Sequence, residues 1–157
     1  MTMPQEQHLD KIVKSVIIRA PRSRVWKALT SSQEFAQWFR VKTEDQFRAG
    51  ARVNMETTYP GHEGQKFWAD VVEMEPEHRF AWQWHPGGNA AGPVPPEEKP
   101  TTVLFVLEEV EGGTRVTVTE SGFDQVSLAR RAKALESNTR GWEMQIQNIR
   151  EYVEQAA

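Results

Sequence analysis

The last third of the chain carries the feature that most limits its fold, a long stripe of residues at helical spacing. The stripe steps by three and four residues through Leu128, Ala132, Leu135, Thr139, Trp142, Ile146, Ile149 and Val153. This period predicts a helix over about residues 126–155, capped by Asp124 or Ser127. A helix of that length with one apolar face must cover another layer of secondary structure.

Weak helix formers interrupt the stripe near its middle. Ser137, Asn138 and Gly141 all have low helix propensity, so a kink or a break has room to occur there. The position of Gly141 beside Trp142 also indicates that the backbone comes close to another part of the molecule at this point.

The segments before this helix have the shorter period of β-strands. Strands are predicted over residues 12–18, 51–57, 65–75, 79–85, 101–110 and 114–120. The pair Val71-Val72 interrupts the alternation of the third strand and predicts a bulge. Strands joined in sequence by short turns form an antiparallel meander.

Two short helices are predicted after the first strand, over residues 22–30 and from Ser31 to about Trp38. Ser31 and Glu34 have the spacing of a capping box. The fold class is therefore α+β: a curved antiparallel sheet wraps around a long C-terminal helix, with two short helices following the first strand.

Length and composition set the class of protein. The 157 residues show no break in composition and predict a single domain, with residues 1–10 as a flexible tail. There are no cysteines, no signal peptide and no apolar run near the ~18 residues of a membrane span, so a cytoplasmic protein without membrane insertion is expected. The net charge of −3 argues against a nucleic-acid partner.

No motif for hydrolysis, nucleotide binding or metal binding is present in the sequence. His8, His62, His78 and His85 lack the spacing of zinc ligands and are interpreted as surface residues, although His85 ends an aromatic strand. No metal or cofactor is expected. Glu120 continues the inward alternation of Val116 and Val118, which would make it a buried acid, base or hydrogen-bond anchor. The favoured interpretation is that the strand ends there and Glu120 meets solvent.

Residues 86–100 form the longest predicted loop. The segment is rich in Gly and Pro and has no apolar period, so it is expected to be mobile, poorly packed and placed at the mouth of any cavity. Deletion of residues 89–95 is accordingly expected to leave folding intact.

Several segments together resemble a known family. Ile17-Ile18-Arg19-Ala20-Pro21 with Val25-Trp26-Lys27-Ala28-Leu29-Thr30 resembles the opening of START-like, helix-grip (SRPBCC) domains, and Trp38-Phe39 matches their aromatic pair. Residues 114–123 and Gly141-Trp142-Glu143 resemble the last strand and closing helix of the branch homologous to activators of the heat-shock-protein-90 ATPase. The resemblance implies a helix-grip fold with a cavity between sheet and helix, and no shared catalytic motif.

The chain has six Trp and seven Phe residues. This aromatic content predicts either a bulky, filled core or a cavity lined by aromatic rings. With the cavity implied by the resemblance, the candidate ligand-binding residues are Trp38, Phe39, Val53, Met55, Trp68, Trp82, Trp84, Phe105, Glu120, Trp142 and Ile146.

Three functional hypotheses follow. The first is a carrier or sensor of a small hydrophobic or aromatic molecule without turnover, as a monomer or homodimer. The second is a cyclase- or aromatase-like enzyme acting on a polycyclic substrate, which needs a buried acid or base such as Glu120. The third is a chaperone-contacting module of the stress response, which needs a surface patch in place of a cavity.

Overall fold

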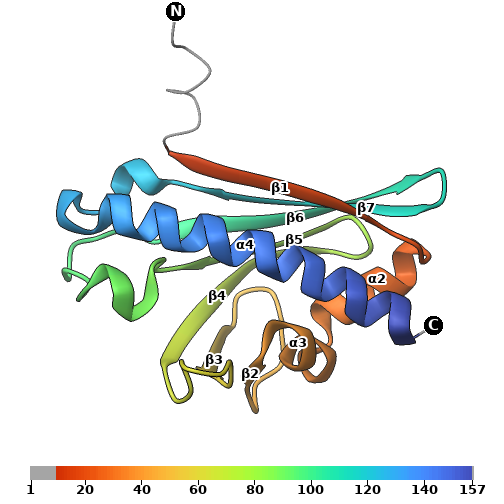
Figure 1. Cartoon of the computed structure of the whole chain (residues 1–157), viewed down its shortest axis with the longest axis horizontal. Helices are drawn as coiled ribbons and strands as arrows, with labels where there is room; N and C mark the ends of the chain where they lie inside the picture. Colours follow the sequence, from red (N-terminus) through yellow and green to blue (C-terminus); the bar gives the residue numbers. More distant parts are fainter. Residues whose placement is uncertain (1–9, 157) are drawn as a thin grey trace, which may run out of the picture.

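In the computed structural model, a long helix lies across one face of a curved antiparallel sheet (Figure 1). The structure describes residues 10–156, so nearly all of the predicted tail, including His8, lies outside the described residues. The elements in chain order are β1 Lys11–Ile18, α2 Arg22–Thr30, α3 Ser32–Phe39, β2 Val41–Lys42, β3 Arg52–Thr57, β4 Lys66–Glu75, β5 Arg79–Trp84, the 3₁₀ turn η1 Gly88–Ala91, β6 Thr101–Val110, β7 Gly113–Ser121, the 3₁₀ turn η2 Phe123–Gln125 and α4 Leu128–Ala156.

The seven strands pair in the order β1-β7-β6-β5-β4-β3-β2. Strands β2 to β7 form a meander. The last strand of the meander, β7, pairs with the first strand of the chain, β1, which forms one edge of the sheet. The predicted α+β helix-grip class is therefore confirmed. The register of β4 against β5 shifts between Val71 and Glu73, which confirms the predicted bulge. The two-residue strand β2 was not predicted, because two residues are too few to show a period.

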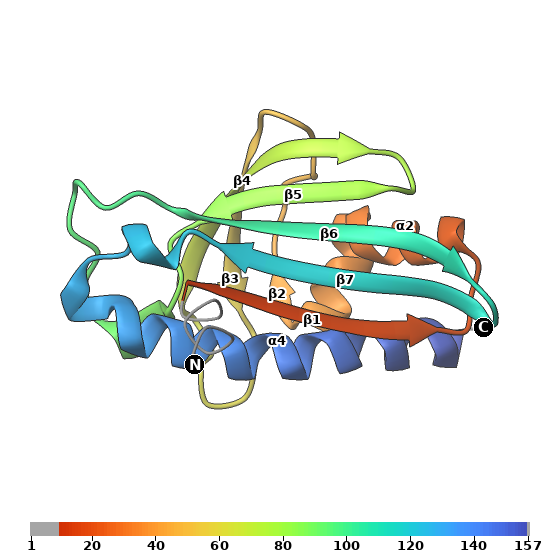
Figure 2. The same cartoon turned by 90° about the horizontal axis from the view of Figure 1, so that it is seen from above.

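Helix α4 is a single helix of 29 residues, and it continues through Ser137, Asn138 and Gly141. Figure 2 shows it running alongside β1, β7 and β6 for most of their length. Burial by tertiary packing outweighs the low propensity of the three residues, so the helix does not break there.

The two halves of α4 bury different sets of residues. In the C-terminal half, Trp142, Ile146, Ile149 and Val153 are buried as the periodicity predicted. The start of the predicted stripe is wrong: Leu128 is 81% exposed and Ala132 is exposed, whereas Arg130 and Ala134 are buried. The reason is that the N-terminal half packs against residues 86–91, whose carbonyl group at Pro86 accepts two hydrogen bonds from Arg130, at 2.7 and 3.2 Å. From Leu135, which is half-buried and packs against the core, the stripe holds.

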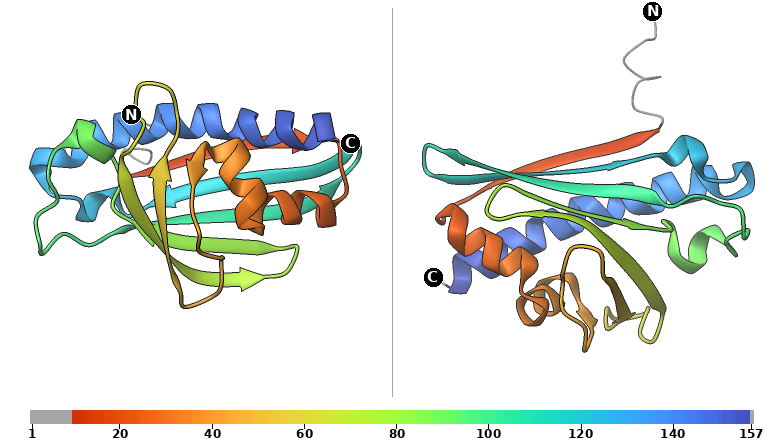
Figure 3. Two further views of the ribbon diagram at one scale, coloured as in Figure 1. Left: turned by 90° about the horizontal axis from the view of Figure 1, so that it is seen from below. Right: turned by 180° about the vertical axis from the view of Figure 1, so that it is seen from behind.

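Helices α2 and α3 cover the C-terminal half of α4 (Figure 3). The Ser31 hydroxyl accepts a hydrogen bond from the Glu34 backbone amide at 3.4 Å, so half of the predicted capping box forms. Because the Ser31 amide already donates to the last turn of α2, the Glu34 carboxylate turns outward and accepts from Arg24 at 2.8 Å and Tyr152 at 3.0 Å. Glu34 thereby links the helix pair to α4.

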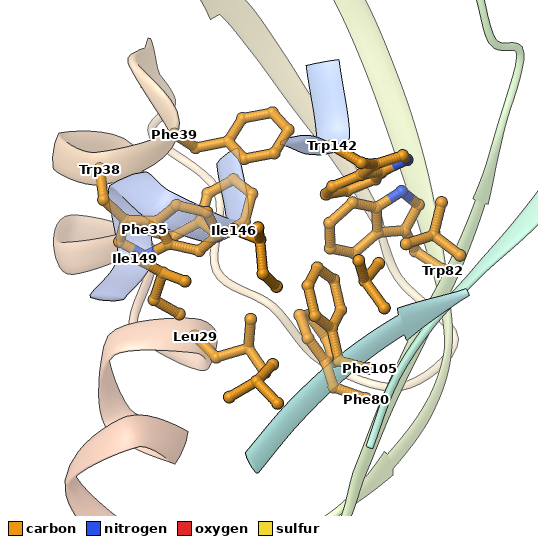
Figure 4. Close-up of a cluster of buried hydrophobic side chains, with 14 of the residues drawn as sticks. Leu29, Phe35, Trp38, Phe39, Phe80, Trp82, Phe105, Trp142, Ile146 and Ile149 are labelled. Carbon is orange, nitrogen blue, oxygen red and sulfur yellow. The ribbon is translucent and has the colours of Figure 1, made fainter. Parts of the chain in front are cut away.

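The core between sheet and helices is filled with aromatic rings (Figure 4). The Trp82 ring lies 5.3 Å from Phe105, 5.8 Å from Phe35 and 6.3 Å from Trp142, measured between ring centroids. Most of these pairs are tilted or edge-to-face, which is the preferred geometry of aromatic pairs. Along this part of α4, the alternative of a filled core applies.

The segment of residues 86–100 is anchored at four positions, so the prediction of a poorly packed loop is wrong at these positions, whereas residues 92–97 are exposed or half-buried as expected. Pro86, Gly87, Ala91 and Glu98 are buried. A Cβ atom at Gly87, whose φ is +95°, would lie 2.6 Å from the Ala91 Cβ and 3.1 Å from the Ala134 Cα. The segment has no apolar period because individual residues, not a continuous face, make these contacts. Deletion of residues 89–95 would remove the packing of Ala91.

Within residues 10–156, none of the helices is both long enough and apolar enough to cross a membrane.

Candidate ligand-binding groove

An open groove of about 570 Å³ separates one side of α4 from β3, β4 and β5. This volume falls within the range of small-molecule sites, about 300–1,000 Å³. The groove is lined by Phe39, Arg40, Val41, Thr57, Tyr59, His62, Gln65, Lys66, Phe67, Trp84, His85, Pro86, Gly87, Gly88, Ser137, Asn138, Arg140, Gly141, Met144 and Gln145.

The sheet side of the groove presents an aromatic wall. The Trp84 ring lies 5.9 Å from Phe67 on β4 and 6.3 Å from Phe39 at the end of α3, measured between ring centroids. Phe67 and Trp84 are only partly buried. In contrast, Trp82, two residues before Trp84 on the same face of β5, is fully buried. These rings offer exposed apolar surface to a bound molecule.

Gly141 keeps the helix side of the groove open. A Cβ atom built at this position meets no heavy atom within 4 Å, so the expected close approach of another segment is wrong. Gly141 lines both the groove and a smaller hollow of about 100 Å³ at its inner end, beside Trp142 and Gln145. A glycine costs helix stability of about 1 kcal/mol relative to alanine, and no packing contact offsets that cost here. The absence of a side chain leaves space.

Glu120 lies behind the inner end of the groove and is fully buried. Its Oε1 accepts hydrogen bonds from Asn138 Nδ2 and Trp142 Nε1, each at 2.8 Å. Its Oε2 accepts from Trp84 Nε1 at 2.8 Å and from the Thr101 hydroxyl at 2.6 Å. The favoured interpretation of a solvent-exposed Glu120 is therefore wrong, because β7 continues to Ser121 and the side chains of Asn138 and Trp142 on α4 cover the carboxylate.

The four donors to Glu120 use the acceptor capacity of its carboxylate, which has about four lone-pair sites. All four are neutral groups, so hydrogen bonds and not a counter-ion satisfy the buried charge. Two of the donors are indole N–H groups on opposite walls, Trp84 from the sheet and Trp142 from α4. Glu120 acts as an anchor that holds both indoles in position.

Asn138 connects this anchor to the segment of residues 86–100. While its Nδ2 donates to Glu120, its Oδ1 accepts a hydrogen bond from the Gly87 amide at 3.1 Å. One side chain on α4 thus fixes both the floor of the groove and the backbone that forms its rim at residues 86–88.

A second polar cluster lies beside the rim, made of His85, Glu98, Ser127 and Arg130. Glu98 accepts from the Ser127 amide at 3.1 Å and lies 3.4 Å from Arg130 and 3.7 Å from His85 Nδ1. Among the described residues, this cluster contains four of the six buried side-chain polar atoms without a hydrogen-bond partner. Burial lowers the pKa of His85 below its ordinary value of 6.5, and the Glu98 charge only partly opposes this effect.

His85 is thus half-buried, which corrects its interpretation as a surface residue, whereas His62 and His78 are exposed as expected. Among residues 10–156, no group of three or more His, Cys, Asp or Glu side chains is placed to hold a metal ion.

Comparison with known proteins identifies the family. Residues 19–154 match the family described as Activator of Hsp90 ATPase homolog 1-like protein. The chain belongs to this family. The match confirms the resemblance of the sequence to that branch of the START-like domains. A search of the curated proteins finds no match.

Solved structures share the fold at low sequence identity. Protein MLL2253 from Mesorhizobium loti is 20% identical, with a TM-score of 0.74 over 94% of this chain and 98% of that one. The Aha1 dimer from Colwellia psychrerythraea is 19% identical, with a TM-score of 0.70 over 92% and 96% of the two chains. DynU16, a protein in the dynemicin biosynthetic locus, is 22% identical, with a TM-score of 0.70 over 94% of this chain and 48% of that one.

In this member of the Activator of Hsp90 ATPase homolog 1-like family, the predicted site residues separate into three groups. Phe39 and Trp84 line the groove, and Trp142 lines the hollow at its inner end, with Glu120 behind it. The residues placed in the filled core are Trp38, Val53, Met55, Trp82, Phe105 and Ile146.

Trp68 is the one predicted site residue on the opposite face of the sheet. It stacks under the Arg52 guanidinium at 4.0 Å and lies near His85. Its neighbour Phe67 pairs with the buried Met55 and faces the groove. Successive residues of a strand point to opposite faces, so the alternation of Ala69 and Val71 indicates Phe67, not Trp68, for the inner face.

Trp68 lines a different depression of about 740 Å³ at the edge of β2, β3 and β4. Although larger, this depression mixes basic Lys42 and Lys66 with acidic Glu44, Asp45 and Glu56, and α4 contributes nothing to it. The groove beside α4 is the better candidate, because sheet and helix both supply its walls.

Most polar residues of the groove were not predicted. Arg40 and Gln65 lie in or beside turns, where no period indicates a direction. Lys66 begins β4, and the alternation of that strand puts it with Trp68, but at the strand end it lines both the groove and the depression beside Trp68. Asn138 and Gly141 had a signal in the sequence, since both are poor helix formers in the middle of a long helix. Here the two residues line the groove, and the helix does not break.

Proposed function

We propose that this protein binds a small apolar or aromatic ligand in the groove between α4 and β3–β5, as a carrier or sensor without turnover. The observation that carries the proposal is the open space at Gly141, in the groove that the half-buried rings of Phe67 and Trp84 also line. Close-packed interiors leave few voids larger than a water molecule, so a space of about 570 Å³ beside a filled core supports a binding site.

The contacts of Glu120 favour binding over catalysis. A general acid or base must reach a proton on the substrate. The Glu120 carboxylate instead makes four hydrogen bonds to protein donors and lies behind Trp84 and Trp142. A cyclase-like reaction on a polycyclic substrate would require this anchor to break at each turnover.

A titration with a neutral anilinonaphthalene dye tests the proposal. Saturable binding to the native protein should quench tryptophan fluorescence, because Trp84 and Trp142 lie at the inner end of the groove. Gly141→Leu should weaken binding by about tenfold or more, since a Leu side chain would occupy space needed by the ligand. Ala132→Leu, which adds a larger side chain on the exposed face of the same helix, is the control.

Equal binding by the wild type and Gly141→Leu, both folded, would place the ligand elsewhere. No saturable binding of any of a broad panel of apolar ligands would remove the proposal and favour the chaperone-contact alternative.

A further inference from the structure

The charged side chains that line the groove are all of one sign. Its lining includes three cationic side chains, Arg40, Lys66 and Arg140, and within residues 10–156 no Asp or Glu lines it. The chain as a whole has 22 acidic and 19 basic residues, with a net charge of −3. A basic groove on an acidic protein is therefore a local feature and not a reflection of composition.

The three cations are available to a ligand to different degrees. Lys66 and Arg40 make no ion pair within 4 Å in the part of the chain that the structure describes. Lys66 lies opposite Glu56 in the β3–β4 ladder, but Glu56 pairs with Lys42 at 3.4 Å. The Arg40 guanidinium lies 5.5 Å from the Tyr59 ring centroid. Arg140 makes a 3.2 Å ion pair with Glu136, which lies outside the groove. All three cationic side chains are exposed. Lys66 and Arg40, at the sheet side, are the freest.

The inner end of the groove has the opposite preference. The rings of Phe39, Trp84 and Trp142 line it together with Gly141 and the side-chain amides of Asn138 and Gln145, which are already hydrogen-bonded within the protein. The Glu120 carboxylate lies directly behind the two indoles. An anion at the inner end would lose its hydration and be repelled by Glu120. An apolar group would contact the aromatic rings there, while an anionic group would be attracted to the cations at the rim.

We infer that the ligand is an amphipathic acid, with an apolar or aromatic body at the inner end and a carboxylate or other anionic group at the rim near Lys66 and Arg40. This inference rests on the proposed function, since it specifies the chemistry of a ligand in the same groove. The rim supplies charge complementarity, which steers an anion and fixes its orientation.

Two dyes that differ by one charged group test the inference. The neutral anilinonaphthalene dye and its sulfonate share the same ring system, and their affinities are compared in the wild type, Lys66→Gln and the double variant Arg40→Gln/Lys66→Gln. One exposed ion pair changes affinity by up to about fivefold. Because two cations, Lys66 and Arg40, can contact the sulfonate, it should bind the wild type about tenfold more tightly than the neutral dye does. This preference should fall with added salt.

The variants should lose the preference for the sulfonate while keeping the affinity for the neutral dye. Lys133→Gln, an exposed position on the outer side of α4 that does not line the groove, is the charge control and should behave as the wild type. Near-ultraviolet circular dichroism confirms that every variant is folded, since anilinonaphthalene sulfonate also binds loosely packed states.

The outcomes are distinct. Equal affinity for the two dyes, or a sulfonate preference that survives in the double variant, overturns the anionic-ligand inference while leaving the groove as a binding site. Failure of both dyes to bind saturably to the folded protein overturns the inference, and failure of the broad panel of apolar ligands as well overturns the proposed function with it. Binding of both dyes that is unchanged by Gly141→Leu also overturns both, because the binding then occurs outside the groove.

Discussion

The space between the sheet and α4 is filled beside Trp82 and open beside Trp84, although the two residues share one face of the same strand. The Trp82 indole has aromatic neighbours on several sides and no exposed surface. The Trp84 indole has the core on one side and the groove on the other. Helices α2 and α3 cover the first region, whereas Gly141 and the rim at residues 86–88 leave the second open.

The difference teaches that aromatic residues do not by themselves make a cavity. Identical side chains on one strand face form packed core or pocket wall according to what the facing helix supplies. Trp142 closes the space with its indole, and Gly141, one residue earlier, opens it. The buried Glu120 fixes the boundary, because it binds the indoles of both Trp84 and Trp142.

Removal of a core ring should have the largest effect on stability. Trp142→Ala should lower the free energy of unfolding by about 3–5 kcal/mol, through lost burial and the cavity that remains. Chemical denaturation measures this loss. Leu128→Ala on the same helix is the control, since an exposed side chain should change stability by no more than about 0.5 kcal/mol. A similar loss in both variants would contradict the division of α4 into a buried and an exposed part.

Glu120→Gln should produce the next largest loss. The NH₂ group of a Gln side chain would face the N–H groups of Trp84, Asn138 or Trp142, which are themselves donors. At least one buried donor would then lose its acceptor, at a cost of about 1–3 kcal/mol. Denaturation together with near-ultraviolet circular dichroism, which reports the packing of Trp84 and Trp142, checks this prediction. Glu109→Gln at an exposed site on β6 provides the control. Unchanged stability in Glu120→Gln would show that the anchor does not hold the indoles.

Gly141→Ala should raise stability by about 1 kcal/mol, because alanine is the better helix former and its methyl group meets no neighbour. A methyl group is small relative to the groove, so ligand affinity should change much less than in Gly141→Leu. A loss of stability in this variant would mean that the groove closes in solution.

The smallest effect should come from His85 at the rim. Its lowered pKa means that below pH 6.5 the unfolded chain takes up a proton that the folded protein resists. The folded protein therefore has its full stability above pH 6.5, where His85 is neutral in both states. Its free energy of unfolding decreases as the pH falls from 6.5 toward the folded-state pKa of His85. The wild type should therefore lose stability relative to His85→Gln in this range, measured by denaturation at several pH values. Parallel curves of stability against pH for the two proteins would contradict this prediction. They would show that the charge of Glu98 fully offsets the effects of burial, Arg130 and Arg52, which all lower the pKa of His85.

Local patterns in the sequence were sufficient for most of the architecture. The period of β6 predicted residues 101–110, which are the observed bounds, and the Val71-Val72 pair marked the bulge in β4. Helix α2 likewise has its predicted bounds. These features depend on neighbours within a few residues, because side-chain direction repeats every 2 residues in a strand and every 3.6 in a helix.

The N-terminal half of α4 shows where local patterns fail. Its apolar residues predicted burial of Leu128, but the partner of that half is the segment of residues 86–91, which shows no period of its own. Arg130 is buried there because the Pro86 carbonyl and Glu98 are placed to receive it. A buried polar group is stable only with partners, and those partners lie more than thirty residues away in the chain.

The sequence by itself determined the six longer strands, the three α-helices and the family to which the chain belongs. Only the tertiary structure decided that Glu120 is a buried anchor and that Gly141 opens a groove whose charged lining residues are Arg40, Lys66 and Arg140. Periodicity reports which side of an element a residue occupies. Whether the space on that side is filled or empty depends on the side chains that other elements bring to it, and these meet only when the chain has folded.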